Sequence, residues 1–533
     1  MLSIIDAVGP FFRGYEKDII NWSKVPFDNL EKDGRFNWEK FKLIKSDFIK
    51  FIKRVKKIGY NSVALDELSR MVEFRFYPER LKSRLNDYSK AYEILIELCR
   101  KEGLKVFVTT DIMFFNEKIK KRCTNDKEIL NFLNEALRKL FTQYNIDGVI
   151  FRIGESDGLD VKGDFLSELV IKTPGQLNRY IENMLPLFEQ FDKLMIIRNW
   201  TMGAYKIGDL MWNKHTFRRA FGDIQSDNFI ISMKYGESDF FRELELNKLF
   251  FETGQKKIIE LQGRREYECF GSLPFYVGWD YEKYYQKLKD EPSFAGINVF
   301  CQSKGWGPWK DITFLQNSSE WNELNTIASL KVFEGKDPGK VIKDYSKDLT
   351  DFLKHYNYVS RKILYFDSRF YFGKIRVPPL FWVFWNYVTV NSLSRAVAKA
   401  TRMGEPEINK KEIDNVYELG KRAGIDIHYI YDTLMMLYYG RRSLVTNENI
   451  DDNINEYKRK YKKFKFFIDY GQKPFLEFFL KIMLRRKKGY RIIDRLVFFS
   501  PLKILIGNII MVYQKSMPGF ANVQGMDVKS IFK

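Results

Sequence analysis

Short apolar segments alternate with amphipathic helical patterns along roughly the first 325 residues of the chain. Apolar runs of about four to eight residues that are bounded by turn residues are typical of buried strands, and the stretches between them have the spacing of helices. This pattern predicts eight strands, at residues 2–8, 61–65, 104–109, 148–153, 194–198, 229–234, 257–262 and 296–300.

Eight strands separated by helices predict a (β/α)₈ TIM barrel, a fold that typically takes about 250 residues. A doubly wound sheet is the alternative. The first strand-to-helix turn has no GxGxxG, and no GxxxxGK[ST] occurs in the chain, so the usual nucleotide-phosphate loops of such sheets are not seen. We therefore expect a catalytic barrel over residues 1–325.

The pattern changes after about residue 330 to longer helical periods, at residues 344–355, 410–423 and 453–466. Periods of this kind are typical of bundled helices. They predict an α-helical C-terminal domain over residues 326–533. Its aromatic run at 377–385 is too short to span a bilayer and is expected to be a packing or interface segment.

Basic clusters at residues 458–463 and 485–488 precede an apolar stretch at 496–513, which Pro501 and Lys503 interrupt. A basic, amphipathic tail of this kind fits an anionic membrane surface. A buried last helix with a solvated basic face explains the same pattern. The apolar run is too short and too broken to predict a transmembrane helix.

The composition is that of a folded protein, with 45% hydrophobic and 16% aromatic residues. The net charge of +20 favours a polyanionic partner, such as nucleic acid, an anionic membrane or an acidic polysaccharide. The bias of an AT-rich genome toward Lys, Phe and Ile explains part of this charge. No nucleic-acid reader motif is recognisable, so we do not expect nucleic acid as a partner.

The four cysteines and three histidines lie far apart, without metal-ligand or disulfide spacing. We therefore expect no metal, no cofactor and no Ser-His-Asp triad, and proton transfer by carboxylates instead. The N-terminus does not resemble a signal peptide, which predicts a cytoplasmic protein, peripheral to the inner membrane if the tail binds there. The oligomeric state is not indicated.

If the first half is a barrel, its functional residues sit at the C-terminal ends of the strands. The fourth strand runs into IDGVIFRIGESDG, which contains Arg152 and Glu155. A rim salt bridge or a turn cap accounts for these two residues equally well. At the ends of the second and third strands, Asp66, Glu67 and Asp111 are further candidates, or likewise caps and rim salt bridges.

Carboxylates interleaved with basic residues and tryptophans suit a carbohydrate-processing site. Cleavage of a glycosidic bond needs one protonated carboxyl group and one ionised carboxylate. Aromatic faces offer flat apolar surfaces to sugar rings. The remaining candidates follow strands five to eight: Arg198 and Trp200; Lys234 and Asp239; Arg265 and Glu266; and Trp306 and Trp309.

These motifs resemble the alpha-glucuronidases of glycoside hydrolase family 67. RIGESDG is similar to that family's Lys-Ala-Asn-Ser-Glu-Gly motif, which implies that Glu155 is the general acid. KYGESDF resembles its Asn-Gly-Pro-Ile-Asp-Phe motif and implies a general base at Asp239, and RREYECFG implies a second catalytic carboxylate at Glu266. IIRNW resembles the family's arginine context at Arg198. The resemblance also implies inversion and a helical domain after the barrel.

Predicted substrate-binding residues surround these carboxylates. A guanidinium group at Arg152 or Arg198 can hold a sugar carboxylate in a two-point contact. The alternative is that these arginines only neutralise Glu155 and Asp239. The other predicted contacts are Trp200, Lys234, Arg265, Trp306 and Trp309, and the competitors for the base role are Glu237, Glu260 and Glu268.

The sequence thus predicts a glycoside hydrolase that acts on an oligosaccharide or polysaccharide containing uronic acids. A separation of about 6.5 to 9.5 Å between acid and base would give inversion, and about 5 Å would give retention. The alternative is a non-catalytic or transglycosylating component of bacterial surface-polysaccharide assembly, held at the inner face of the membrane by its tail.

Overall fold

The computed structural model describes residues 1–16, 24–153, 164–201, 205–237, 244–265, 273–301, 313–315, 319–365, 387–390 and 404–446. It also describes single positions or pairs at 240, 242, 268, 395–396, 398–399, 455, 459, 474–475, 477–478, 486–487 and 490–491, and the short strand 465–468.

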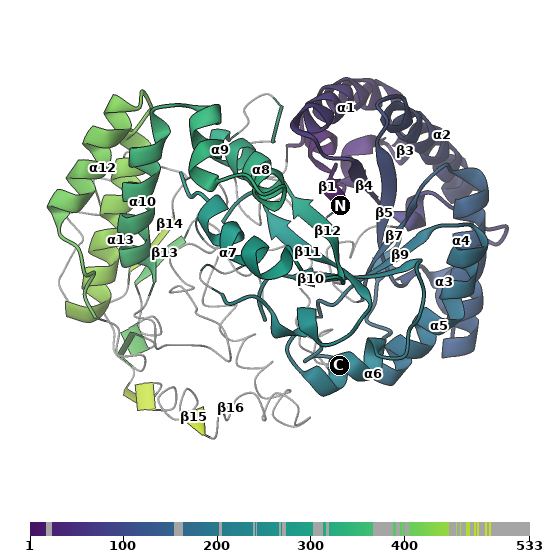
Figure 1. The fold of residues 1–533 in the computed structure, drawn as a ribbon. Helices are drawn as coiled ribbons and strands as arrows, with labels where there is room; N and C mark the ends of the chain where they lie inside the picture. Colours follow the sequence, from purple (N-terminus) through teal and green to yellow (C-terminus); the bar gives the residue numbers. More distant parts are fainter. Residues whose placement is uncertain are drawn as a thin grey trace.

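Eight parallel strands close into a barrel in the order β1-β12-β11-β10-β9-β7-β5-β4 (Figure 1). The closed ring confirms the predicted TIM barrel and excludes the doubly wound sheet. Every predicted strand corresponds to one barrel strand: β1 Leu2–Asp6, β4 Ser62–Asp66, β5 Lys105–Asp111, β7 Gly148–Arg152, β9 Leu194–Arg198, β10 Phe229–Lys234, β11 Lys256–Gln262 and β12 Phe294–Phe300.

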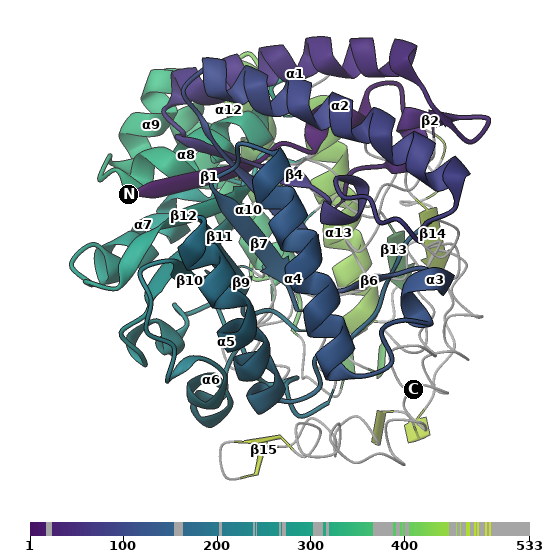
Figure 2. The ribbon, with the colours of Figure 1, turned by 90° about the vertical axis from the view of Figure 1, so that its right-hand side faces the viewer.

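Helices cover the outside of the barrel, with α1 and α2 across one side and α4 and α5 beside them (Figure 2). They connect successive strands: α1 Trp38–Ile58, α2 Glu79–Lys101, α4 Asp126–Gln143, α5 Pro174–Gln190, α6 Lys214–Phe221 and α7 Gly278–Leu288, with α8 Glu320–Phe333 after the last strand. Between β10 and β11, the described residues form only the 3-10 turn η4 Lys248–Phe251.

Shorter elements lie within the connections near the barrel. They are η1 Gly9–Phe12, η2 Phe27–Leu30, the β2–β3 hairpin Glu31–Lys32 and Arg35–Phe36, η3 Leu68–Arg70, α3 Glu117–Lys120, and the paired strands β6 Phe114–Phe115 and β8 Leu166–Ser167.

Helix α1 illustrates how the sequence sets these elements. Asn37 caps its N-terminus by accepting a hydrogen bond from the Lys40 amide, and Gly59 ends it in the left-handed conformation that glycine adopts easily. Between these caps, a stripe of apolar residues, including Phe41, Phe48 and Phe51, is buried against the barrel.

The C-terminal half is largely helical where it is described, with α9 Pro338–Tyr345, α10 Leu349–Leu364, α12 Lys410–Arg422 and α13 His428–Thr446. Figure 1 shows α10, α12 and α13 stacked together beside the barrel, beyond α8 and α9. Two strand pairs complete the described elements: β13 Tyr387–Val390 with β14 Lys465–Ile468, and β15 Arg486–Lys487 with β16 Tyr490–Arg491.

Two predicted helices need correction. The helix expected at 344–355 is broken: residues 344–345 end α9, Ser346 is extended, and residues 349–355 belong to a new helix, α10. Serine and aspartate favour helix ends, since their side chains compete for main-chain hydrogen bonds. The helix expected at 453–466 falls mostly outside the described residues, and its last two, Lys465 and Phe466, belong to β14, which pairs with β13.

Helix α8 joins the barrel to the helical region, because it is buried on both sides. Leu330, Val332 and Phe333 pack into the large core around the barrel. Trp321, Leu324 and Ala328 belong to a second core with α9, α10, α12 and α13. The predicted division at residues 325/326 stays a prediction, and α8 crosses that position.

Candidate active site

Strand alternation builds the inside of the barrel in layers. Because successive side chains of a strand point to opposite faces, every second residue faces the barrel axis. One inward layer forms a separate buried apolar cluster: Ile4, Ala64, Phe107, Ile150, Ile196, Ile230 and Ile258. Two residues further along the same strands stand polar or charged side chains: Asp6, Asp66, Thr109, Arg152, Arg198, Ser232 and Glu260. The interior is therefore apolar in the first layer and charged toward its C-terminal end.

Three carboxylates gather around Arg152 at this end, and we call Asp66, Glu67 and Asp111 the carboxylate cluster. The guanidinium of Arg152 donates from Nη2 to Glu67 Oε2 at 2.6 Å and from Nε to Asp111 Oδ1 at 2.7 Å. Its Nη1 lies 3.6 Å from Asp66 Oδ1. Arg152 is 1% exposed, so these ion pairs are shielded from water.

Lys24 adds a second cation to the carboxylate cluster. Its Nζ lies 3.0 Å from Asp111 Oδ2, and the next residue, Val25, donates its amide to Asp66 Oδ2 at 3.2 Å. Within the described part of the chain, three carboxylates thus face two cations in a buried place. An excess of carboxylates over cations favours the retention of a proton.

Glu67 is the carboxyl group that holds this proton, because burial raises its pKa most. Burial raises the pKa of Glu67 to about 8 and that of Asp66 to about 6, although Arg152 opposes both shifts. Thr110 also donates its hydroxyl to Glu67. Near neutral pH the cluster therefore contains a protonated carboxyl group beside ionised ones, the combination that acid–base catalysis requires.

A small recess that opens to solvent lies against the carboxylate cluster. Glu67, Asp111 and Lys24 line it, together with Phe27, Ser69, Arg70, Phe114, Phe165 and Leu166. Arg70 is held in the wall by Asp164 at 2.6 Å and lies over the ring of Phe27 at 4.9 Å. Polar groups beside aromatic walls are what sugar rings contact in proteins.

A second buried ion pair lies across the barrel. Glu260 is 0% exposed and accepts from Arg198 at 2.7 Å and 3.0 Å, and from the Ser232 hydroxyl at 2.9 Å. Arg198 also lies 5.0 Å from the centre of the Phe300 ring. The guanidinium of Arg198 is thus fixed by Glu260 inside the barrel.

Lys234 and Trp200, two predicted substrate contacts, lie together. The Lys234 ammonium is 3.4 Å from the centre of the Trp200 ring and 4.6 Å from that of Phe240. Lys234 is buried, and Trp200 is partly exposed. A cation against aromatic faces is stabilised by the ring electrons, which makes this pair a fixed part of the rim.

Asp6 and Arg265 complete the described rim. Burial raises the pKa of Asp6 to about 6, and its carboxylate accepts the Cys301 amide at 2.5 Å. Arg265 is buried and forms an ion pair with Asp280 in α7. Sequence reasoning missed Asp6, although its place at the end of the first strand is the same signal that indicates Asp66. It also missed Lys24, for which the sequence carries no signal.

The predicted catalytic residues Glu155, Asp239 and Glu266, and the predicted platforms Trp306 and Trp309, lie outside the described residues. Their roles stay predictions. Of the competitors for the base role, Glu260 is bound to Arg198, and Glu268 is bound to Arg242 and Tyr365.

Metal-binding clusters and membrane-spanning helices are absent from the described part of the chain. No group of three or more His, Cys, Asp or Glu side chains there is arranged to hold a metal ion. No helix in that part has the length and apolar character needed to cross a membrane.

Comparisons with known proteins found no matching family model and no matching curated protein. Among solved structures, the chain is similar to a GH138 enzyme targeting pectin rhamnogalacturonan II, at 11% identity and a TM-score of 0.48, over 99% of this chain and 64% of that one. This chain thus spans less than two thirds of that protein.

Two further solved structures match over somewhat more than half of the chain. One is the β-mannanase from the blue mussel Mytilus edulis, at 11% identity and a TM-score of 0.34, over 57% of this chain and 89% of that one. The other is an endocellulase from Pyrococcus horikoshii, at 13% identity and a TM-score of 0.35, over 54% of this chain and 86% of that one. Because these identities and TM-scores are low, function is inferred from the site itself.

Proposed function

We propose that this protein is a glycoside hydrolase whose active site lies at the C-terminal end of the barrel. The observation that carries the proposal is the carboxylate cluster beside the recess, where Glu67 keeps a proton near neutral pH while Asp111 forms ion pairs with Lys24 and Arg152. Active sites of this fold lie at this end of the barrel.

The reaction adds water across a glycosidic bond. One carboxyl group gives its proton to the leaving oxygen, and one carboxylate takes a proton from the water that attacks the sugar. The general acid is proposed to be Glu155, from the resemblance to family 67, or Glu67, from the geometry of the recess. Asp239 and Glu266 are the proposed base and second carboxylate, and the proposed outcome is inversion.

The proposed substrate is an acidic glycan that contains uronic acid, with an alpha-glucuronidase-like activity. The net charge of +20 supports this choice, since a cationic surface attracts polyanions. Lys24 and Arg70 place cations in the recess itself. The proposed location is the cytoplasm, where such an enzyme meets imported or newly made oligosaccharides.

The test is a panel of uronic-acid and neutral oligosaccharides, with released sugar followed by mass spectrometry. We would compare the natural protein with Glu155→Gln, Glu67→Gln and Asp111→Asn. Glu39→Gln is the matched control, because Glu39 is exposed on α1 and pairs with Lys42 on the same helix. Loss of a general acid lowers turnover by roughly 10²- to 10⁴-fold, while the control keeps full activity.

The pattern of loss assigns the roles. Release that vanishes in Glu155→Gln but survives in Glu67→Gln assigns the acid to Glu155, and the reverse assigns it to Glu67. If neither change reduces release, or if no sugar in the panel is cleaved, the proposal fails.

A second candidate function is a role in surface-polysaccharide assembly at an anionic membrane. The charge of +20 and the basic clusters before the apolar stretch 496–513 favour it. Co-sedimentation with vesicles containing anionic lipid, lost at high salt and on removal of residues 480–533, would support it. Equal binding to neutral vesicles would count against it.

A further inference from the structure

Two loops at the barrel rim are tied to the helical region. We call residues 235–255, between β10 and β11, the β10 loop, and residues 263–277, between β11 and α7, the β11 loop. These loops contain Asp239 and Glu266, two of the proposed catalytic residues. In its described residues, the β10 loop has only the short turn η4 in place of a barrel helix.

Arg242 and Glu268 join the two loops. Arg242 Nη2 lies 2.8 Å from Glu268 Oε2, and the two residues are 4% and 1% exposed. Removing one partner of a buried ion pair leaves the other charged and unpaired, which is strongly destabilising. This pair therefore holds the β10 loop and the β11 loop to each other.

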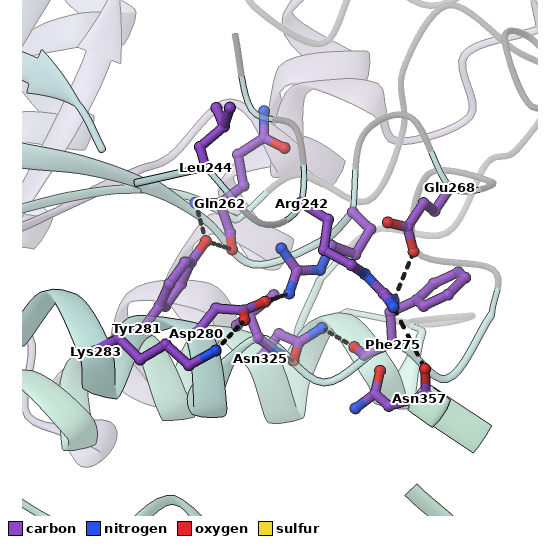
Figure 3. A network of polar contacts seen from close by, with 12 residues as sticks. Arg242, Leu244, Gln262, Glu268, Phe275, Asp280, Tyr281, Lys283, Asn325 and Asn357 are labelled. Atoms are coloured by element: carbon purple, nitrogen blue, oxygen red, sulfur yellow. Dashed lines mark hydrogen bonds and ion pairs between the residues drawn. The ribbon is translucent and has the colours of Figure 1, made fainter. Parts of the chain in front are cut away.

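The same pair contacts α10. Tyr365, the residue that ends α10, donates its hydroxyl to the other oxygen of Glu268. Burial raises the pKa of Tyr365 far above its ordinary value, so the hydroxyl keeps its proton. Arg242 also donates to the Asn357 carbonyl in α10 at 3.5 Å, and Figure 3 shows Arg242 between Glu268 and Asn357.

The end of α10 is in turn fixed by α13. Arg441 donates from Nη1 to the carbonyls of Ile363 at 2.9 Å and Tyr365 at 3.1 Å, and also to that of Lys362. The last carbonyls of a helix have no partner within it, and a cation there also balances the helix dipole. Burial lowers the pKa of Arg441 to about 10, which leaves it charged near neutral pH. A continuous chain of contacts thus runs from α13 to the β10 loop.

The far end of the β11 loop is fixed by α8 and α9. Asn325 of α8 donates to the Phe275 carbonyl at 2.6 Å and accepts the Val277 amide at 2.9 Å, and the first of these bonds is drawn in Figure 3. Tyr276 donates its hydroxyl to the Pro338 carbonyl at the start of α9, at 2.8 Å. Leu273, Phe275 and Tyr276 are buried in the core of the helical region.

Glu268 is poorly placed to act as a catalytic base. Arg242 holds one of its carboxylate oxygens and Tyr365 holds the other. Glu67 also has both oxygens bonded, to Arg152 and Thr110, but it lines the recess, whereas Glu268 is 1% exposed and is not among the lining residues. Its partners instead place Glu268 where three segments meet: the β10 loop, the β11 loop and α10.

We propose that the helical region completes the active site, and that Glu268 is a positioning residue that fixes the β10 and β11 loops against α10. This inference rests on the proposed function for its catalytic consequence, but the fixation of the loops does not depend on it. Catalytic groups held on loops lose rate steeply when they move, by roughly 10²-fold for a displacement of about 1 Å.

The test combines hydrogen–deuterium exchange with kinetics on the full chain. The variants are Tyr365→Phe, which removes one hydroxyl, Glu268→Gln, which removes the charge, and Arg242→Lys, which keeps the charge without the fork. Tyr431→Phe is the matched control, since Tyr431 donates to a carboxylate, Asp414 Oδ1, at 2.7 Å between α12 and α13.

For Tyr365→Phe and Glu268→Gln, we expect faster exchange in peptides covering residues 235–248 and 264–277, and unchanged exchange in β1 and α1. For Tyr431→Phe, we expect unchanged exchange in both loops. On a cleaved substrate, kcat should fall roughly 10- to 100-fold, a larger change than that in KM, because other segments line the recess and Arg265 is the one proposed substrate contact in these loops. For Arg242→Lys, both the exchange rate of the loops and kcat should lie between the values for the natural protein and those for Glu268→Gln.

Hydrogen–deuterium exchange and kinetics together distinguish failure of the positioning role from failure of the proposed glycosidase activity. Unchanged exchange in both loops of folded Tyr365→Phe and Arg242→Lys overturns the positioning role, whatever the kinetics. Faster exchange with no cleavage of any glycan by the natural protein supports the fixation of the loops and overturns the glycosidase. Faster exchange with unchanged kcat shows that the loops are fixed but carry no catalytic group, which also overturns the inference.

Discussion

Among single residues, Glu67 is a buried carboxyl group that keeps its proton near neutral pH, and this affects the stability of the fold. It is buried beside Asp66 and Asp111, and within the described part of the chain Arg152 and Lys24 are the cations that face the three carboxylates. Groups of carboxylates that keep one proton are typical of acid–base sites. The same environment costs the fold stability whenever that proton is lost.

The stability of the protein should therefore depend on pH through Glu67. In the unfolded chain Glu67 ionises near its ordinary pKa of 4.5, whereas burial holds its folded pKa at about 8. Between these values the folded state binds the extra proton, so the free energy of unfolding falls as pH rises through this window, by at most about 1.4 kcal/mol per pH unit. Glu67→Gln cannot titrate and should gain stability relative to the natural protein from pH 5 to pH 8.

Urea unfolding of both proteins at pH 5, 6.5 and 8 measures this difference. Glu39→Gln serves again as the exposed control and should follow the natural protein at every pH. A stability difference between Glu67→Gln and the natural protein that stays constant over this range would contradict the buried, protonated state.

The sequence indicates part of this site. The rule that functional residues follow parallel strands finds Asp66, Glu67 and Asp111. The rule also finds Arg152 but not its pairing with these carboxylates, because Arg152 reaches them across β5, and it does not find Lys24, which comes from the segment before η2. Which side chains meet inside a barrel depends on the stagger of its strands, and that is a property of the closed sheet.

Among the elements, the barrel strands depend on two glycines for close approach. A β-carbon on Gly296 of β12 would lie 1.9 Å from the Leu2 carbonyl oxygen of β1, and one on Gly148 of β7 would lie 2.2 Å from that of Leu194 in β9. Gly296 also has a φ of 155°, which other residues rarely adopt. The closure of the ring between its first and last strands thus needs glycine.

Gly296→Ala should destabilise the protein by about 1–3 kcal/mol or more, because the added methyl group forces β1 and β12 apart. Gly254→Ala is the control, since no described atom lies within 4 Å of its added β-carbon. Thermal unfolding followed by circular dichroism measures both. An equal melting temperature for the two variants would contradict the close contact of β1 with β12.

The eight strands are predictable from sequence because each is a short apolar run between turn residues. The break between α9 and α10 is less visible, since the helical period continues across Ser346 and Asp348 and only their capping tendency marks the end. The predicted helical period also includes Lys465 and Phe466, yet these residues belong to β14 because they pair with β13, which lies far away in the chain. Contacts that distant leave little local signal.

In the molecule as a whole, α8 belongs to two cores at once. Its residues Leu330 and Phe333 pack with the barrel, and Trp321 and Leu324 pack with the helical region. A periodicity search cannot place a domain boundary in such a helix, because apolar residues occur all around it.

The barrel and the helical region should therefore unfold together. We expect one endotherm in differential scanning calorimetry of the full chain, with a calorimetric enthalpy close to the van't Hoff enthalpy. Tyr365→Phe should lower the melting temperature of this single transition without splitting it. Two resolved transitions in the natural protein would contradict the shared core.

The ties between rim and helical region also bear on how specificity can change. On one side, Lys24, Phe27 and Phe165 line the recess from connections that follow β1 and β7. On the other, Arg242 and Glu268 are bound to α10. Substitutions on the first side must suit the recess and the barrel core beneath it, while those on the second must suit a helical partner as well. Divergence toward new substrates, in nature or in a directed library, should therefore proceed fastest through the loops around Phe27 and Phe165.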